Sequence, residues 1–558
     1  MFPCEKGRRR LGVVGIAVSL TLGAGACTGG TTGSAGGAAS GGRALTMTAG
    51  AVTTWVRNFN IYSPASDKSP APRLIFEPLV RVDYTKGAEI EPWLAKSFDW
   101  NDDGTELTFH LRSDVSWSDG QRFDADDVLF TLQLMLDKPE LNLAGVSYKK
   151  VTKVDARTVK VSWDHPAYTE LSSFGTGHLD IVPEHQWAGK DLKSWTNPEP
   201  VGTGPYTVGN FGSQQVTYRA RDHYWGKPVA VPTIKIPAVL GDATQPKLLS
   251  GELDLATAAW TNADKEFVAK NPKTNLYRVY AQGGSTALYF NNAVAPYNNV
   301  HVRRAISAAV DAGKMLALSN TGQAAANITG LDEQTYGDII AEQYRGKINK
   351  QDVGLAKKEL AASGYQVKDG KLVKDGKSYP LELKFIQEYA NWQAFARGFA
   401  DQAGKSLGLA VKLSPVQSSS FDPEVNEGDF GMAFNYAGSG TGVYNAYSSM
   451  LDSKYAKPIG TNSNFNNTVR WRDPKTDELL DKLRRTDDTE RIKKLSAELE
   501  KIVAEQVPLR PLFQTVWFVD INASRWRGWP EPGESGYVPH FINGPDFTMT
   551  LQNLKPAT

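Results

Sequence analysis

Apolar residues recur along the chain with two periods, one typical of strands and one typical of helices. The run from Leu107 to Leu111 alternates apolar and polar residues, which predicts a strand with one buried face. Further on, Asp124-Ala-Asp-Asp127 opens a helix whose apolar residues are Val128, Leu132 and Met135. Carboxylates in a first helical turn complement the positive end of the helix dipole. Strands alternating with such helices predict an α/β protein of more than one lobe.

The C-terminal third continues the pattern with two amphipathic helices. Asp473-Pro474 combines an N-cap with proline at the first helical position, and the helix follows through Leu483. A second helix starts near Asp487, has Glu490 in a capping box and continues to Ile502. Earlier, residues 302–310 predict another helix. Residues 507–513 and 516–519 are expected to be extended, and we find no internal repeat.

The first 44 residues follow neither period. Basic residues precede an apolar run from Leu11 to Leu22, shorter than the roughly 20 residues of a membrane span and typical of a secretion signal. Ala24-Gly25-Ala26-Cys27 resembles a lipobox, so we expect a signal peptide at 1–26 and lipidation of Cys27. Ordinary cleavage beside an incidental cysteine is the alternative, and Arg8-Arg9 leaves a twin-arginine export route open. The Gly/Ser/Thr/Ala-rich residues 27–44 predict a flexible tether.

Composition narrows the class of protein further. The 558 residues are 41% hydrophobic and 22% charged, with 14 Trp and 21 Tyr, as in a folded protein with a large core. Loss of four basic residues and one acidic residue with the leader would take the net charge from +1 to about −2. Such a charge does not predict nucleic-acid binding. Cys4 leaves with the leader and Cys27 is acylated, so we expect no disulfide.

Four blocks carry a family resemblance. They are "LAKSFDWNDDGTELTFHLRSDVSWSDGQRFDADDVLFTL" from Leu94, "VGTGPYTVGNF" from Val201 followed by "RDHYWG", "GELDLA" from Gly251, and "LYFNNAVAPYNNVHVRRAISAAVD" from Leu288. In this order behind a lipobox, they resemble the family 5 extracellular solute-binding proteins of bacterial ABC importers. That family serves peptides, oligosaccharides and, in one branch, nickel.

The resemblance implies an architecture. We expect an α/β, two-lobed periplasmic-binding-protein-like fold (type II, cluster C) with an extra subdomain inserted in lobe one. Placed on this sequence, lobe one is 45–88, 200–300 and 515–558, the insert is 89–199, and lobe two is 301–514. The two crossing segments are expected near Asn291–Val300 and Pro508–Thr515. Closure around this hinge would bury the ligand and create a shape that the transporter recognises.

The ligand class rests on the segment from Gly431 to Leu451. Peptide-binding members usually carry an acidic residue in the corresponding region, which neutralises the α-ammonium group of the peptide. This segment contains no Asp, Glu, Lys or Arg. Its amides, hydroxyls and tyrosines favour an oligosaccharide, with an oligopeptide as the alternative if Asp422, Glu424 or Asp429 meets an ammonium group.

Amide side chains and aromatic rings near the expected cleft form the candidate ligand site. The candidates are Trp55, Asn58, Asn60, Trp260, Gln282, Ser285, Asn291, Asn435, Tyr436, Tyr444, Gln514 and Trp517. For Trp55, Trp260 and Trp517 the alternative is a place in the core, because tryptophan is often buried. For Asn291 the alternative is a bridge between backbone groups at the hinge.

No catalytic or metal-binding motif stands out. Gly438-Ser-Gly-Thr-Gly442 lacks the lysine of a phosphate-binding loop, the seven His form no His-x₃-His pair, and there is no Gly-x-Ser-x-Gly elbow. We expect no cofactor and no enzymatic activity, although counting carboxylates does not exclude a secreted glycosidase. The expected partners are an ABC permease and its ATPase subunits, with the protein a monomer held through Cys27 at the extracytoplasmic face of the membrane.

Overall fold

A computed structural model of the chain describes residues 43–50, 52–63, 69–86, 88–142, 146–175, 179–438 and 440–557. The predicted signal peptide, Cys27 and nearly all of the tether lie outside these residues. From Gly42 onward the chain forms one compact unit. Its elements are grouped below into lobe one, an insert and lobe two.

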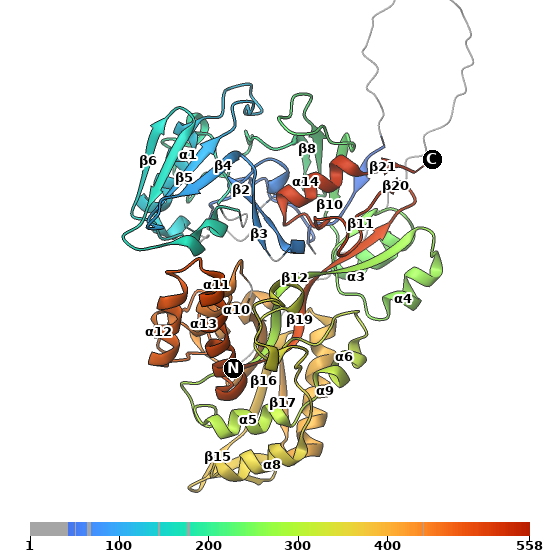
Figure 1. Cartoon of the computed structure of the whole chain (residues 1–558). Coiled ribbons are helices and arrows are strands. Elements are labelled where there is room, and N and C mark those ends of the chain that lie inside the picture. The colour runs from blue at the N-terminus through green and yellow to red at the C-terminus, as the bar shows by residue number, and fades with distance from the viewer. Residues whose placement is uncertain are drawn as a thin grey trace, which may run out of the picture. The chain divides into compact units, whose positions relative to one another are not determined.

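Lobe one contains a four-stranded sheet in the order β1-β10-β9-β8, in which only β1 and β10 pair in parallel. Two-stranded pairs and short helices complete it (Figure 1). Its elements are β1 (Leu45–Thr46), β2 (Val80–Asp83), β3 (Glu89–Pro92), β8 (Tyr206–Gly212), β9 (Gln215–Ala220), β10 (Thr233–Pro237), α3 (Gly241–Leu249), β11 (Leu255–Ala256), α4 (Ala263–Glu266), β20 (Trp526–Arg527), α14 (Gly544–Asn553) and β21 (Lys555–Pro556).

The insert is built on an antiparallel sheet in the order β4-β5-β7-β6. All four strands lie within the predicted segment 89–199, whereas β3 at the start of that segment pairs with β2 of lobe one. The insert and lobe one share one hydrophobic core. The elements of the insert are β4 (Ala95–Trp100), β5 (Glu106–Leu111), α1 (Ala125–Asp137), β6 (Lys150–Asp155), β7 (Thr158–Ser162), the 3₁₀-helix η4 (Tyr168–Phe174) and α2 (Glu184–Trp187).

A six-stranded mixed sheet has the strand order β11-β19-β12-β18-β16-β17. The last three strands of this order, β18, β16 and β17, belong to lobe two. A three-stranded sheet, β13-β14-β15, lies outside it. The elements of this lobe are α5 (Val300–Ala308), α6 (Ala312–Ser319), α7 (Glu333–Tyr336), α8 (Val353–Ala362), β13 (Gln366–Lys368), β14 (Lys371–Lys374), β15 (Lys377–Tyr379), β16 (Leu381–Ile386), α9 (Ala390–Leu407), β17 (Val411–Val416), α10 (Ser418–Glu427), β18 (Met432–Ala437), α11 (Val443–Leu451), α12 (Pro474–Leu483) and α13 (Thr489–Lys501).

Two long antiparallel strands carry the chain between the lobes. They are β12 (Asn275–Phe290) and β19 (Leu509–Asn522), which run side by side (Figure 1). Tyr280 and Trp517 oppose each other in the core of lobe one, while residues 287–290 and 509–513 belong to the core of lobe two. The crossing on β12 therefore precedes the expected segment Asn291–Val300, because the strand is longer than the sequence pattern indicates.

Local sequence patterns predicted the starts of α1 and α12 correctly. Asp124 caps α1 in a reciprocal capping box with Asp127, and Asp473 caps α12 with Pro474 in its first turn. The N-cap of α13 is Asp488, one residue after the expected start, so Glu490 lies two residues after the cap and the expected capping box with Asp487 is wrong. The two extended segments predicted at 507–519 form the single strand β19.

Candidate functional site

A cavity of about 930 Å³ lies between the insert and lobe two, near the upper end of the usual range of about 300–1,000 Å³ for ligand sites. The insert lines it mainly with residues 165–173, from η4 and the turn before it. Lobe two lines it with residues from α11, α12 and the loop between them. The cavity thus lies between two parts of the chain about 270 residues apart.

Asn445 of α11 joins the two walls of this cavity. Its Nδ2 donates to Ser172 Oγ at 3.2 Å and to the Thr169 carbonyl at 3.4 Å, both on η4. The same amide also donates to the Thr441 carbonyl at 2.8 Å, at the start of its own helix. Because these contacts link lobe two to the insert, they form only when the two walls lie against each other.

Neutral polar side chains make up much of the cavity wall. Ser172 and Thr441 are buried, and Ser449 and Asn445 are half-buried. The neutral polar residues are Asn142, Ser147, Thr169, Ser172, Ser173, Thr441, Asn445, Ser448, Ser449, Asn464 and Asn466. Three aromatic residues, Tyr444, Tyr455 and Phe465, share the wall with them. Such a lining offers hydrogen-bond donors and acceptors beside flat apolar surfaces.

The charged residues of the cavity are mostly paired within its wall. Lys454 Nζ lies 2.8 Å from Asp452 Oδ2, and Arg484 Nη2 lies 2.6 Å from Asp481 Oδ1. Glu170 differs, since no cation of the described chain lies within ion-pair distance of it and its contact is Ser147 Oγ at 3.4 Å. Burial raises the pKa of Glu170, while the charges of Lys454 and Arg484 act in the opposite direction.

A second, smaller cavity of about 210 Å³ adjoins the first and shares Tyr444 with it. Its wall is largely apolar, with Ile90, Leu171, Val443 and Ile492. Together the two cavities place Tyr444 between a polar and an apolar environment. Of the twelve predicted ligand residues, all within the described ranges, Tyr444 is the one that lines these two cavities.

Gln514, on the crossing strand β19, belongs to a separate polar cluster with Gln323, Asn391 and Asp332 of lobe two. Gln514 donates from its side-chain Nε2 to Asp332 Oδ1 at 3.1 Å, and the backbone carbonyl of Gln514 accepts from Gln323 Nε2 at 3.1 Å. Asn391 Nδ2 then donates to Gln323 Oε1 at 3.0 Å. Asp332 is buried, and burial raises its pKa. The cluster holds Gln514 of β19 against lobe two at the point where the strand leaves it.

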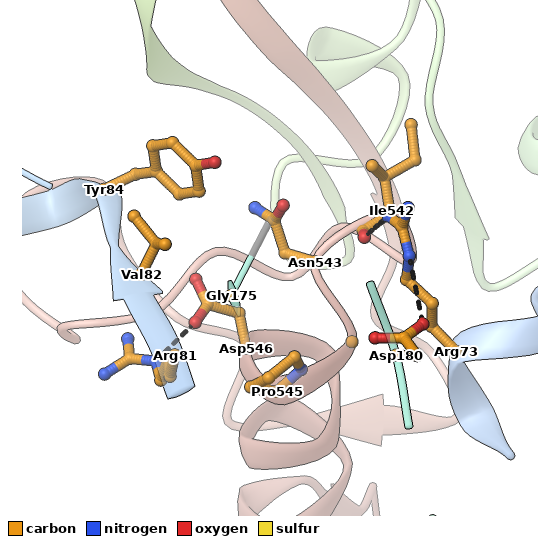
Figure 2. Close-up of a pocket in the computed structure, with 11 residues that line it drawn as sticks. Arg73, Arg81, Val82, Tyr84, Gly175, Asp180, Ile542, Asn543, Pro545 and Asp546 are labelled. Atoms are coloured by element: carbon orange, nitrogen blue, oxygen red, sulfur yellow. Dashed lines mark hydrogen bonds and ion pairs between the residues drawn. The ribbon is translucent and has the colours of Figure 1, made fainter. Parts of the chain in front are cut away.

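A small polar pocket of about 20 Å³ lies between lobe one and Gly175 and Asp180 of the insert (Figure 2). Arg81 Nε lies 2.6 Å from Asp546 Oδ1, and Arg73 Nε lies 3.9 Å from Asp180 Oδ2. Burial raises the pKa of Asp546 to about 6 and that of Asp180 to about 7, and the neighbouring arginines oppose both shifts. The volume suits about one water molecule, so this pocket is too small for the solute.

Four of the predicted site residues in or near lobe one have their side chains buried and engaged within the protein. Trp55 donates from Nε1 to the Ile236 carbonyl, and Asn60 donates to the carbonyls of Leu192 and Trp195. Asn58 accepts from the Asn60 backbone, and Trp260 stacks on Phe267 at 4.7 Å between ring centroids. These contacts favour the core alternative for Trp55 and Trp260, and they give Asn58 and Asn60 partners within the fold. The contact of all four with a ligand stays a prediction.

Asn291 is fully buried at the end of β12. Its Nδ2 donates to the carbonyls of Gly428 and Phe430, and its Oδ1 accepts from the Ala293 backbone. Asn291 therefore bridges backbone groups, as the structural alternative expected, but it does so within lobe two and not at the crossing between the lobes.

The remaining predicted residues lie on the crossing strands β12 and β19 or on the adjacent strand β18. Ser285 is buried and pairs with both Gln514 and Ala437, while Gln282 is half-buried. Asn435 and Tyr436 lie on β18, and the Tyr436 ring is 42% exposed beside Trp392. Trp517 is buried edge-on against Tyr84, and its Nε1 has no partner among the described residues. They neighbour the crossing, and their contact with a ligand stays a prediction.

Sequence reasoning missed the wall that the insert contributes. Ser147, Thr169, Glu170 and Ser172 belong to a segment with no recognisable motif. The asparagine-rich run from 462 to 467 could have been recognised as part of the site, because its amide side chains are of the same kind as those of the predicted ligand residues.

Within the described ranges, no three His, Cys, Asp or Glu side chains are grouped as metal ligands would be. No described helix combines the length and apolar character that crossing a bilayer needs. A two-lobed fold with a large cavity between its walls defines a protein that binds a solute.

Comparison with known proteins identifies the family. Residues 89–458 match the model of the bacterial extracellular solute-binding proteins, family 5, and the chain belongs to this family. The family resemblance and the two-lobed fold predicted from sequence are thereby confirmed. Members are solute-binding proteins of ABC importers, and this chain is a substrate-binding protein of that kind.

Relatives of this chain are named for different solutes. It is 28% identical over 493 residues to heme-binding protein A of Haemophilus influenzae, covering 82% of this chain and 83% of the relative. It is 26% identical to the nickel-binding periplasmic protein of Escherichia coli, covering 68% and 72%. It is 25% identical to di/tripeptide-binding protein 1 of Pseudomonas aeruginosa, covering 81% and 85%.

Solved structures share the fold. A periplasmic oligopeptide-binding protein of Thermotoga maritima superimposes with a TM-score of 0.82 at 23% identity, covering 92% of this chain and 99% of that one. Its mannohexaose-bound structure gives a TM-score of 0.78 with the same coverage. At this identity, the likeness establishes the architecture alone.

Proposed function

We propose that this protein captures an oligosaccharide between the insert and lobe two and delivers it to an ABC permease and its ATPase subunits. The observation that carries the proposal is the 930 Å³ cavity, in which eleven neutral amide or hydroxyl side chains accompany three aromatic residues. Sugar hydroxyls pair with amides and hydroxyls, and the apolar faces of sugar rings pack on aromatic rings. The T. maritima neighbour bound to mannohexaose supports the same class of ligand.

The proposed mechanism is a shift toward a closed state. A ligand that contacts both walls binds the closed arrangement better and so increases its population. The contacts of Asn445 with η4 join the same two walls, and they therefore also stabilise the closed arrangement. Tyr444 contributes stacking area, and we keep Gln282, Ser285, Asn435, Tyr436, Gln514 and Trp517 as candidate contacts nearer the crossing strands. Lipidation at Cys27, with the protein a monomer, completes the proposal.

Calorimetry on the mature protein tests the ligand class. Mannohexaose, cellohexaose and xylohexaose are titrated beside a dipeptide, a tripeptide and a nonapeptide, and we expect binding of at least one sugar. The sugar should be recovered unchanged after incubation, because a glycosidase would cleave it. Binding confined to the peptides would refute the oligosaccharide proposal.

An oligopeptide is the second candidate, and Glu170 is the observation that favours it. Its half-buried carboxylate has no ion-pair partner among the described residues, and the α-ammonium group of a peptide would supply one.

Replacing Glu170 by Gln separates the two ligand classes. If the ligand is a sugar, the amide keeps a hydrogen-bonding group and affinity should change less than about threefold. If the ligand is a peptide whose ammonium group meets Glu170, affinity should fall roughly tenfold or more. The exposed Glu184 of the insert, changed to Gln, is the matched control. Calorimetry with the ligand found for the wild type provides the measurement.

A further inference from the structure

The loop of residues 462–470, between α11 and α12, presents an aromatic side chain at the cavity wall. Phe465 lines the 930 Å³ cavity and is 62% exposed. Its neighbours Asn464 and Asn466 line the same cavity. Phe465 is thus an apolar ring set among amide groups, open to whatever occupies the cavity.

The backbone of this loop adopts an unfavourable conformation to achieve this. Phe465 has a φ of 62°, and Asn464, Asn467 and Arg470 also have positive φ, at 51°, 38° and 59°. Asparagine enters the left-handed region readily, whereas phenylalanine does so at a steric cost. The position favours Asn or Gly on backbone grounds, so the aromatic side chain is not there for the sake of the fold.

Two buried asparagines hold the loop in this shape. Asn426 of α10 accepts at Oδ1 from the Phe465 backbone N–H at 2.7 Å and from Ser463 Oγ at 3.0 Å. Asn467, also buried, donates from its backbone to the Ser449 carbonyl at 2.6 Å and from Nδ2 to the Asp452 carbonyl at 2.9 Å. The loop is therefore fixed to α10 and to the end of α11 before any ligand arrives.

We infer that Phe465 is a pre-organised stacking platform for a pyranose ring of the bound oligosaccharide. A single exposed apolar residue is ordinary on a protein surface. This one combines exposure, a place on the cavity wall and an enforced left-handed backbone. A rigid aromatic group costs little conformational entropy on binding, which makes it an effective contact. The inference rests on the proposed oligosaccharide function.

Phe465→Asn is the decisive variant, because it removes the ring while suiting the backbone. We expect affinity for the tightest-binding of mannohexaose, cellohexaose and xylohexaose to fall about tenfold. The thermal midpoint of the unliganded protein should stay the same or rise, since Asn accepts the left-handed conformation. Phe465→Tyr should keep affinity within about threefold. The control is Asp375→Asn, at an exposed position with a φ of 51° in the β14–β15 turn, and should change neither quantity.

Each result has one consequence. If the wild type binds a sugar and Phe465→Asn binds it equally well, the platform is refuted and the proposed function stands. If Phe465→Asn lowers the thermal midpoint by several degrees, the ring serves the fold and the platform is also refuted. If the wild type binds none of the three sugars, the proposed function fails and the platform fails with it.

Discussion

Stability should fall by about 4 kcal/mol between pH 4 and pH 7 through one buried carboxyl group, Asp180. Its side chain is 2% exposed, its Oδ1 has no partner among the described residues, and Arg73 lies 3.9 Å from Oδ2. Burial raises its pKa to about 7, with Arg73 opposing the shift and Glu77 reinforcing it. The unfolded chain loses this proton near pH 4 and the folded protein keeps it to about pH 7. The folded state therefore binds more protons within this window, and stability decreases as pH rises through it.

Urea unfolding of the wild type and Asp180→Asn at pH 4.5, 6 and 8 measures this effect. The variant should lose the contribution of Asp180, while Asp520 and Asp546, whose pKa values burial also raises, keep theirs. Asp369→Asn, at an exposed turn, should follow the wild type. Parallel profiles for wild type and Asp180→Asn would mean that Asp180 is ionised in the folded protein.

Replacing Asn291 by Ala should destabilise the protein by about 2–4 kcal/mol while leaving ligand affinity unchanged. The amide of Asn291 donates to Gly428 O at 3.0 Å and to Phe430 O at 3.1 Å in a fully buried site. Alanine leaves both carbonyls without these donors, and Gly428 and Phe430 are buried. Since these carbonyls precede β18, the loss weakens the attachment of β12 to lobe two.

Chemical unfolding and calorimetry on the same preparations test this expectation. Asn298→Ala, at an exposed position of the same segment, is the control and should change neither quantity. A variant with normal stability and weakened binding would instead assign Asn291 to the ligand, as its place near the expected cleft suggested.

Signals that act over a few residues were read correctly from the chain alone. The Asp124–Asp127 start of α1 and the Asp473-Pro474 start of α12 both depend on side chains that bond to backbone within three residues. The four family blocks also carried their information locally, and they led to the correct family and fold.

The site depended on contacts that no local pattern encodes. Asn60 meets carbonyls more than 130 residues away, and Asn445 meets Ser172 across 273 residues. An asparagine that stabilises a loop and one that faces a cavity look the same in sequence, because the amide group suits both roles. Only tertiary structure decided that Asn60 and Asn291 satisfy buried carbonyls while Asn445 joins two walls. The sequence determined the family, the two-lobed fold class and several helix starts; packing between distant segments decided which polar side chains line the cavity.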